Sequence, residues 1–176
     1  MARFLLVLLL CGCGLGLRAD VTLPALFSDN MVLQRGIAAP VWGKAAPGEQ
    51  VTISIAGQQA TATAGADGRW LARLAPLAAG GPLEMTVAGK NTIILHNVLV
   101  GEVWVCSGQS NMQFVLRTAR DGAREADEAN YPRIRMFTVP NATAAAPLTD
   151  CAGTWEVSSK DTARAFSAVG YFFARE

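Results

Sequence analysis

Residues 108–112 carry the residue types that could do chemistry, Gly-Gln-Ser-Asn-Met, directly after a nearly continuous apolar run at 98–106. Such a run predicts a buried strand, and the residues after Ser110 place apolar side chains at helical spacing. We therefore expect Ser110 on a sharp turn between a strand and a helix. A serine hydroxyl there can act as a nucleophile if a base removes its proton and an oxyanion hole stabilises the tetrahedral intermediate.

The neighbours of Ser110 could supply part of that oxyanion hole. The backbone N–H of Ser110 and the positive end of the helix would point toward the developing oxyanion. We predict that Gly108 permits the tight turn and close approach of substrate, that Asn111 holds the turn through its amide, and that Gln109 supports the substrate. The spacing alone is a weak signal, because Met112 stands where the Gly-x-Ser-x-Gly elbow has glycine. A serine that merely caps a helix is the alternative.

No base accompanies this serine in the sequence. His96 is the only histidine, and if residues 97–106 are extended at about 3.3 Å each it lies roughly 30 Å from Ser110. We expect His96 at the junction of two domains instead. Glu102 interrupts the apolar run and needs a polar partner, so it is predicted to give structural support, with catalysis as the alternative. Arg35 is either solvated or paired with a carboxylate.

Composition excludes several classes of protein. The 176 residues are 51% hydrophobic and 16% charged, with a net charge of +1, which is typical of an ordinary folded domain. So small a charge attracts neither nucleic acid nor an anionic membrane. No Cys-x-x-Cys or histidine pair indicates a metal, and we expect no cofactor. The predicted partner is a neutral or weakly charged small molecule or glycan.

Residues 1–19 have the pattern of a signal peptide. Arg3 supplies the positive charge, residues 4–10 are apolar, and Ala19 offers a small residue for cleavage. Lipidation at Cys13 is the alternative, and the apolar core is shorter than the ~20 residues that cross a bilayer. The sequence thus predicts an exported protein, periplasmic or secreted.

Export leaves Cys106 and Cys151 in the mature chain. An oxidising compartment permits a disulfide between them, but two cysteines do not specify one. The other interpretation is that Cys106 is a buried strand residue that behaves as a small hydrophobe.

Residues 20–97 have the pattern of an all-β module. Short runs of strand-forming residues, separated by turn residues, recur at 41–43, 50–55, 59–63, 70–74, 83–87 and 92–95. This spacing favours a small antiparallel β-sandwich. Trp42 and Trp70 could be platforms for stacking sugars, although tryptophans in a small sandwich more often fill its core.

Residues 98–176 change to an alternation of strands and helices. After the run at 98–106 we predict helices at 111–120 and 123–130, a strand at 134–139, a loop through 150 and a helix at 161–176. Strand, helix, strand, helix is the opening of an α/β sheet domain.

Several blocks together are similar to the bacterial sialate O-acetylesterase family, of the SGNH hydrolase type. The blocks are residues 26–35, 40–43, 67–70, 80–82, 98–112 and 166–176. The resemblance implies a β-sandwich module at 20–97 and, at 98–176, the first part of a three-layer α/β/α hydrolase domain. It also implies a serine esterase that removes acetyl groups from sugars, with Ser110 as nucleophile.

In such hydrolases, the resemblance further implies, a glycine and an asparagine from later blocks complete the oxyanion hole, and a carboxyl-terminal histidine with an aspartate is the base. None of these blocks is visible before Glu176, so we expect a truncated fragment that is inactive alone. Acetylated sialic acid and acetylated xylan-type polysaccharide stay open as substrates. The alternative is a non-catalytic glycan-binding or structural β-module attached to a degenerate hydrolase piece.

Overall fold

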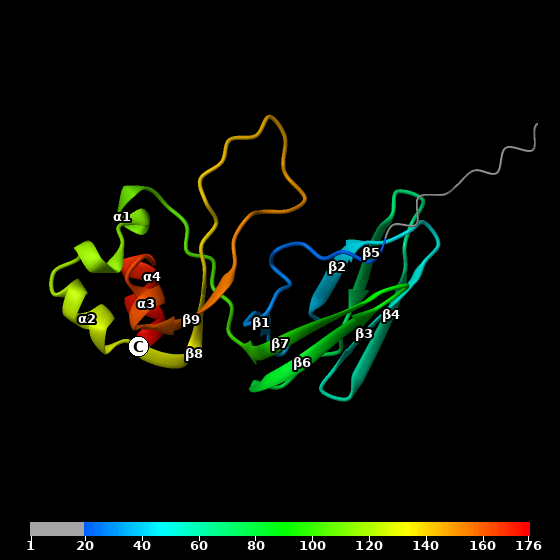
Figure 1. Ribbon diagram of the computed structural model, residues 1–176, viewed down its shortest axis with the longest axis horizontal. Coiled ribbons are helices and arrows are strands. Elements are labelled where there is room, and N and C mark those ends of the chain that lie inside the picture. Colours follow the sequence, from blue (N-terminus) through cyan, green and yellow to red (C-terminus); the bar gives the residue numbers. More distant parts are fainter. Residues whose placement is uncertain (1–19) are drawn as a thin grey trace, which may run out of the picture.

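The computed structural model describes residues 20–176, and the signal peptide predicted at 1–19 lies outside them. Two parts, each with its own hydrophobic core, make up these residues. One part is built of strands, and the other of short helices and a hairpin (Figure 1). The strands of the first part are β1 (Val32–Gln34), β2 (Pro40–Lys44), β3 (Gln50–Ile55), β4 (Gln58–Thr63), β5 (Arg69–Arg73), β6 (Gly80–Ala88) and β7 (Thr92–Gly101).

The first part contains a five-stranded sheet in the order β1-β7-β6-β3-β4 and a two-stranded sheet of β2 and β5. Side chains of both sheets fill one core, because alternate residues point inward: Val51, Ile53 and Ile55 on β3, and Trp70 and Ala72 on β5. The strands predicted for this module are confirmed within a few residues. The prediction of an antiparallel module is wrong at one edge, where β1 pairs with β7 in parallel.

The two tryptophans of this part lie on opposite faces of the two-stranded sheet. Trp70 is 3% exposed and belongs to the core, as the more common role of such tryptophans predicts. Trp42 is half-buried on the outer face, where its ring meets that of Phe27 edge to face at 4.6 Å. The core interpretation is therefore confirmed for Trp70, while Trp42 packs against the edge of the core and stays partly exposed.

Strand β7 ends earlier than the apolar run that suggested a strand at 98–106. Val98, Leu99 and Val100 are buried because they lie between β1 and β6. Residues 102–109 then leave the sheet in exposed, irregular conformation, so the second half of the predicted strand is wrong. Cys106 is accordingly exposed rather than buried, and Cys106 and Cys151 are both free thiols.

The second part packs short helices around a two-stranded antiparallel hairpin. Its elements are α1 (Ser110–Gln113), the 3-10 helix η1 (Leu116–Thr118), α2 (Gly122–Glu128), β8 (Asn130–Phe137), β9 (Trp155–Ser159), α3 (Lys160–Ala163) and α4 (Ala168–Arg175). Fully buried Leu116, Ala126, Ala163 and Tyr171 form its core. Strand β9 was not predicted, and β8 pairs with β9 rather than with β7.

Two of the predicted helices are interrupted. The helix expected at 111–120 breaks at Phe114 and Val115, whose backbones are extended. The helix expected at 161–176 divides into α3 and α4, because the hydroxyl of Ser167 accepts a hydrogen bond from the N–H of Gly170 and starts a new helix. No helix within residues 20–176 combines the length and the apolar character that crossing a bilayer requires.

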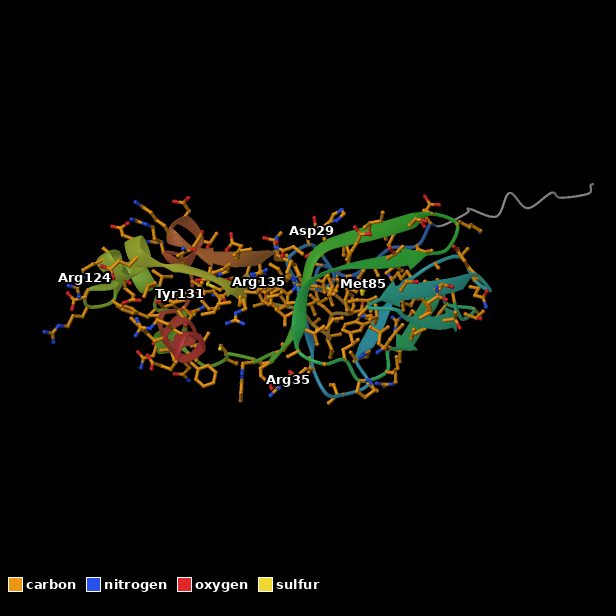
Figure 2. The ribbon with its side chains drawn as sticks, turned by 90° about the horizontal axis from the view of Figure 1, so that it is seen from below. Asp29, Arg35, Met85, Arg124, Tyr131 and Arg135 are labelled. Atoms are coloured by element: carbon orange, nitrogen blue, oxygen red, sulfur yellow. The ribbon has the colours of Figure 1, made fainter. Side chains whose placement is uncertain are left out.

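Polar contacts join the two parts. The indole N–H of Trp155 on β9 donates to the carbonyl of Leu26 at 2.9 Å. Arg135 on β8 donates to the side-chain oxygen of Asn97 on β7 at 3.1 Å, and Asn97 in turn donates to Asn30 at 2.7 Å. Figure 2 shows Arg135 at this junction, on the side of the helical part that faces the sheet.

We predict that Gly43→Ala destabilises the first part. A Cβ on Gly43 would clash with the carbonyl oxygen of Thr22 and would lie 2.8 Å from the indole Cζ2 of Trp70. Overpacking of this kind costs about 1–3 kcal/mol, and urea denaturation measures it. Gly80→Ala on β6 is the control, because a Cβ there meets no atom within 4 Å. Equal losses in the two variants would contradict this account.

Candidate active site

Ser110 is the first residue of α1, as the sequence predicted. Gln109 precedes it in extended conformation, with φ −120° and ψ −150°. The carbonyl of Gln109 accepts hydrogen bonds from the N–H groups of Met112 at 2.9 Å and Gln113 at 3.2 Å. Ser110 is exposed, so its hydroxyl is accessible to a substrate. The preceding strand, however, ends at Gly101 and does not lead directly into this turn.

The neighbours of Ser110 do not all act as predicted. Gly108 has no positive φ, and a Cβ there would make only an ordinary 3.5 Å contact with Met112, so this backbone does not require glycine. Asn111 accepts a hydrogen bond from the N–H of Phe114 through its carbonyl. Within residues 20–176 its side-chain amide makes no hydrogen bond, and its predicted role in holding the turn is wrong. Support of a substrate by Gly108, Gln109 and Asn111 stays a prediction.

The residues that hold α1 in place come from the start of α4. The Ser167 hydroxyl donates to Sδ of Met112 at 3.3 Å, and the Ala168 N–H donates to the carbonyl of Phe114 at 2.8 Å. The block at 166–176 therefore packs against the block at 108–112. Sequence reasoning did not identify Ser167 as a supporting residue, although a serine ahead of a helical apolar pattern is a recognisable cap signal.

Glu102 has the polar partners that the sequence required. Its carboxylate accepts hydrogen bonds from Nε2 of Gln34 at 2.8 Å and from Nε of Arg35 at 2.5 Å. These bonds, that of Gln34 first, lower the pKa of the Glu102 carboxyl below its ordinary value. Gln34 also accepts from the N–H of Val103 at 2.8 Å. Glu102 thus fastens the segment that leads to Ser110 onto β1, which is the structural role predicted for it.

His96 is not beside Ser110. It lies on β7 in the first part, where its imidazole Nδ1 is 3.4 Å from Oε2 of Glu84. Its backbone N–H donates to the carboxylate of Asp29 at 2.7 Å. Ser110 belongs to the second part (Figure 1). The residue after His96 is Asn97, which contacts Arg135 across the junction, in agreement with the expected place of this histidine. Within residues 20–176 the site is an accessible serine alcohol at a helix start, without a histidine base beside it.

Relatives with similar sequences are named sialate O-acetylesterases. The Rattus norvegicus enzyme is 36% identical over 166 residues, which cover 86% of this chain and 30% of the relative. The Homo sapiens enzyme is 34% identical over 158 residues, which cover 82% and 30%. No protein-family model matches the sequence.

A solved structure agrees with these relatives. A carbohydrate acetylesterase from Xanthomonas citri matches with a TM-score of 0.86 and 40% identity, over 88% of this chain and 36% of that one. The chain belongs to the sialate O-acetylesterase family. It spans about a third of the length of these family members. The match extends over most of the described residues, so the arrangement of strands and helices around Ser110 is shared with a solved acetylesterase.

We predict that the contact between α2 and α4 loses its stabilising effect in acid. Glu125 on α2 accepts hydrogen bonds from Arg175 at 2.6 Å and from the hydroxyl of Tyr171 at 3.1 Å. The bond from Arg175 contributes most to lowering the pKa of the Glu125 carboxyl below its ordinary value of 4.5. A lowered pKa in the folded state means that this contact stabilises the protein above that value and ceases to do so as the pH falls below it.

Glu125→Gln is therefore expected to lower the free energy of unfolding by about 1 kcal/mol at neutral pH. The difference from the wild type should shrink as the pH falls below the ordinary carboxyl pKa, as thermal denaturation at several pH values would show. Glu128→Gln, on the same helix and without a recorded ion pair in residues 20–176, is the control. A difference that persisted unchanged into acid would argue against this contact.

Proposed function

We propose that this chain is part of a carbohydrate O-acetylesterase, in which Ser110 is the nucleophile. The observation that carries the proposal is the match of both parts to a solved carbohydrate acetylesterase, with an accessible serine at the start of α1. Relatives named for the removal of acetyl groups from sialic acid support the same reaction.

The reaction follows from the chemistry of a serine alcohol. The Oγ of Ser110 attacks the carbonyl carbon of an acetyl ester, and a base takes the hydroxyl proton. The backbone N–H of Ser110 donates to the oxyanion that forms. Collapse of the intermediate expels the sugar oxygen, which takes up the proton, and water then hydrolyses the acetyl-enzyme to acetate. Gly108, Gln109 and Asn111 would line the approach of the substrate.

The base is proposed to be a histidine other than His96. His96 lies on β7 in the first part and faces Glu84, so it cannot reach the Ser110 hydroxyl. From the resemblance to SGNH hydrolases we expect the base histidine, with an aspartate, in later blocks. An Asp-x-x-His sequence in a longer reading frame would support the esterase, and a longer frame that lacks it would favour the non-catalytic alternative.

The finer architecture is part of the same proposal. The five-stranded sheet and the β2-β5 sheet share one core, which supports a β-sandwich module for residues 20–97. Val103, Trp104 and Val105 are 39%, 66% and 90% exposed, and within residues 20–176 they have no strand partner. Exposed apolar residues of this kind would be covered in a three-layer α/β/α sheet that begins near residue 98.

Export is proposed on the sequence of residues 1–19, with cleavage after Ala19 and a periplasmic or secreted product. The choice of substrate follows the relatives only in part. Those from mammals are named for sialate, whereas the Xanthomonas citri enzyme is named for carbohydrate in general. We propose acetylated sialic acid first and acetylated xylan-type polysaccharide second.

Ser110→Ala is expected to lower hydrolysis of p-nitrophenyl acetate by at least about 10³-fold in the longest reading frame that contains this sequence. The acetyl-enzyme cannot form without the hydroxyl. The release of p-nitrophenol measures the rate, and Ser107→Ala, at a neighbouring exposed serine, is the control. Undiminished turnover by Ser110→Ala would reject this residue as the nucleophile.

The 176-residue chain by itself is expected to hydrolyse p-nitrophenyl acetate no faster than a Ser110→Ala version of it. The physical reason is that its single histidine lies in the other part. The same assay on both purified chains makes this comparison. Serine-dependent turnover that equals that of the longer protein would show that the base is present after all.

A further inference from the structure

A groove lies along the β2-β5 sheet, in a different part of the molecule from Ser110. Its volume is about 690 Å³. One wall is formed by β2 and β5, and the other by the loop between β8 and β9, which approaches the first part in Figure 1. The residues that line it include Leu23, Trp42, Lys44, Arg69, Leu71 and Asp150.

The register of the two strands places an apolar pair beside a cationic pair. Trp42 lies opposite Leu71, and Lys44 lies opposite Arg69. The residues that alternate with them are buried, so all four lie on the outer face of the sheet, where half-buried Trp42 also packs against Phe27. Residues two apart on a strand are about 7 Å apart. The apolar pair and the cationic pair are therefore neighbours on one face of the sheet, about 7 Å apart along the strands at the level of the backbone. Trp42 is half-buried there, and Leu71 is 52% exposed.

The positive charges of this groove are poorly neutralised. Like charges directly opposite each other on neighbouring strands destabilise a sheet. Arg69 has one acidic neighbour, Asp67, at 3.7 Å, and Lys44 forms no ion pair within the described residues. Asp150, the acidic residue among the lining, keeps its negative charge, but it forms no ion pair with Lys44 or Arg69 within the described residues. Its Oδ1 accepts hydrogen bonds from the N–H groups of Ala25 at 3.0 Å and Cys151 at 2.8 Å.

We propose that the groove binds a sugar that carries a carboxylate. The apolar face of the ring would stack on Trp42 and Leu71, since a flat indole suits the C–H face of a pyranose. The carboxylate would lie between Lys44 and Arg69 and relieve their repulsion. The choice of a carbohydrate rests on the proposed function, whereas the choice of an anionic one rests on the groove itself. The groove would hold a sugar other than the one attacked at Ser110.

The test is calorimetric titration of the purified protein with a trimer of N-acetylneuraminic acid. The same trimer with its carboxylates converted to methyl esters is the matched neutral ligand. We expect the acidic trimer to bind at least about fivefold more tightly than the ester, and its affinity to fall as salt is added. Equal binding of the two ligands, or no binding at millimolar concentration, would overturn the proposal.

Variants of the groove locate the binding. Lys44→Gln and Arg69→Gln are each expected to lower the affinity for the acidic trimer about two- to fivefold, and Trp42→Ala is expected to lower it about tenfold. Arg124→Gln removes a positive charge from an exposed position on α2, in the other part of the molecule, and should leave the affinity unchanged. Trp42 also contacts Phe27, so the exposed Lys44 and Arg69 variants decide the matter if Trp42→Ala does not fold. Unchanged affinity in both would reject the site.

Ser110→Ala separates the two proposals. It should retain full affinity for the trimer while esterase activity is lost. A protein that binds the trimer through Lys44 and Arg69 but hydrolyses no acetyl ester would support the proposed binding groove and reject the proposed esterase function. An active esterase that does not bind the trimer would support the proposed function and reject the binding groove.

Discussion

The pairing of β7 on both of its edges is the constraint on which the rest of the structure depends. Its antiparallel neighbour β6 and its parallel neighbour β1 cover Val98, Leu99 and Val100. Asn97, in the middle of the strand, has a φ of +56°, a conformation that asparagine tolerates better than most residues. Its amide meets Asn30 on one side and Arg135 on the other. One strand therefore completes the first core and anchors the second part to it.

Between the end of β7 and Ser110, hydrogen bonds to other elements hold the chain in place. Glu102 is held by Gln34 and Arg35 beside β1, and α1 is held by the start of α4. A helix as short as Ser110–Gln113 is not stable by itself, because the first turn costs more conformational entropy than one hydrogen bond returns. Its position therefore depends on Ser167 and Ala168, more than fifty residues later in the chain.

The positions of the strands along the chain could be predicted closely for the first part, except for β1, and poorly for the second. Residues 50–55 alternate between core and surface, and local pattern alone marks them as a strand. The residue at which β7 ends could not be predicted from local pattern. Val103, Trp104 and Val105 are as apolar as Val98, Leu99 and Val100, but only the latter have strands beside them. Apolar residues indicate a preference for burial, whereas burial itself requires a partner.

The resemblance of several blocks to the sialate O-acetylesterase family was needed to identify Ser110 as the candidate nucleophile. The types and order of the residues were sufficient to exclude His96 as its base and to require a partner for Glu102. These two conclusions need only chemistry and distance along the chain. Tertiary structure alone decided that Gln34 and Arg35 are that partner, that Ser167 supports α1, and that Lys44 faces Arg69 beside Trp42. The physical reason is that each of these contacts joins residues 25 to 68 positions apart, and pairing at such separations is set by strand register and packing rather than by local sequence.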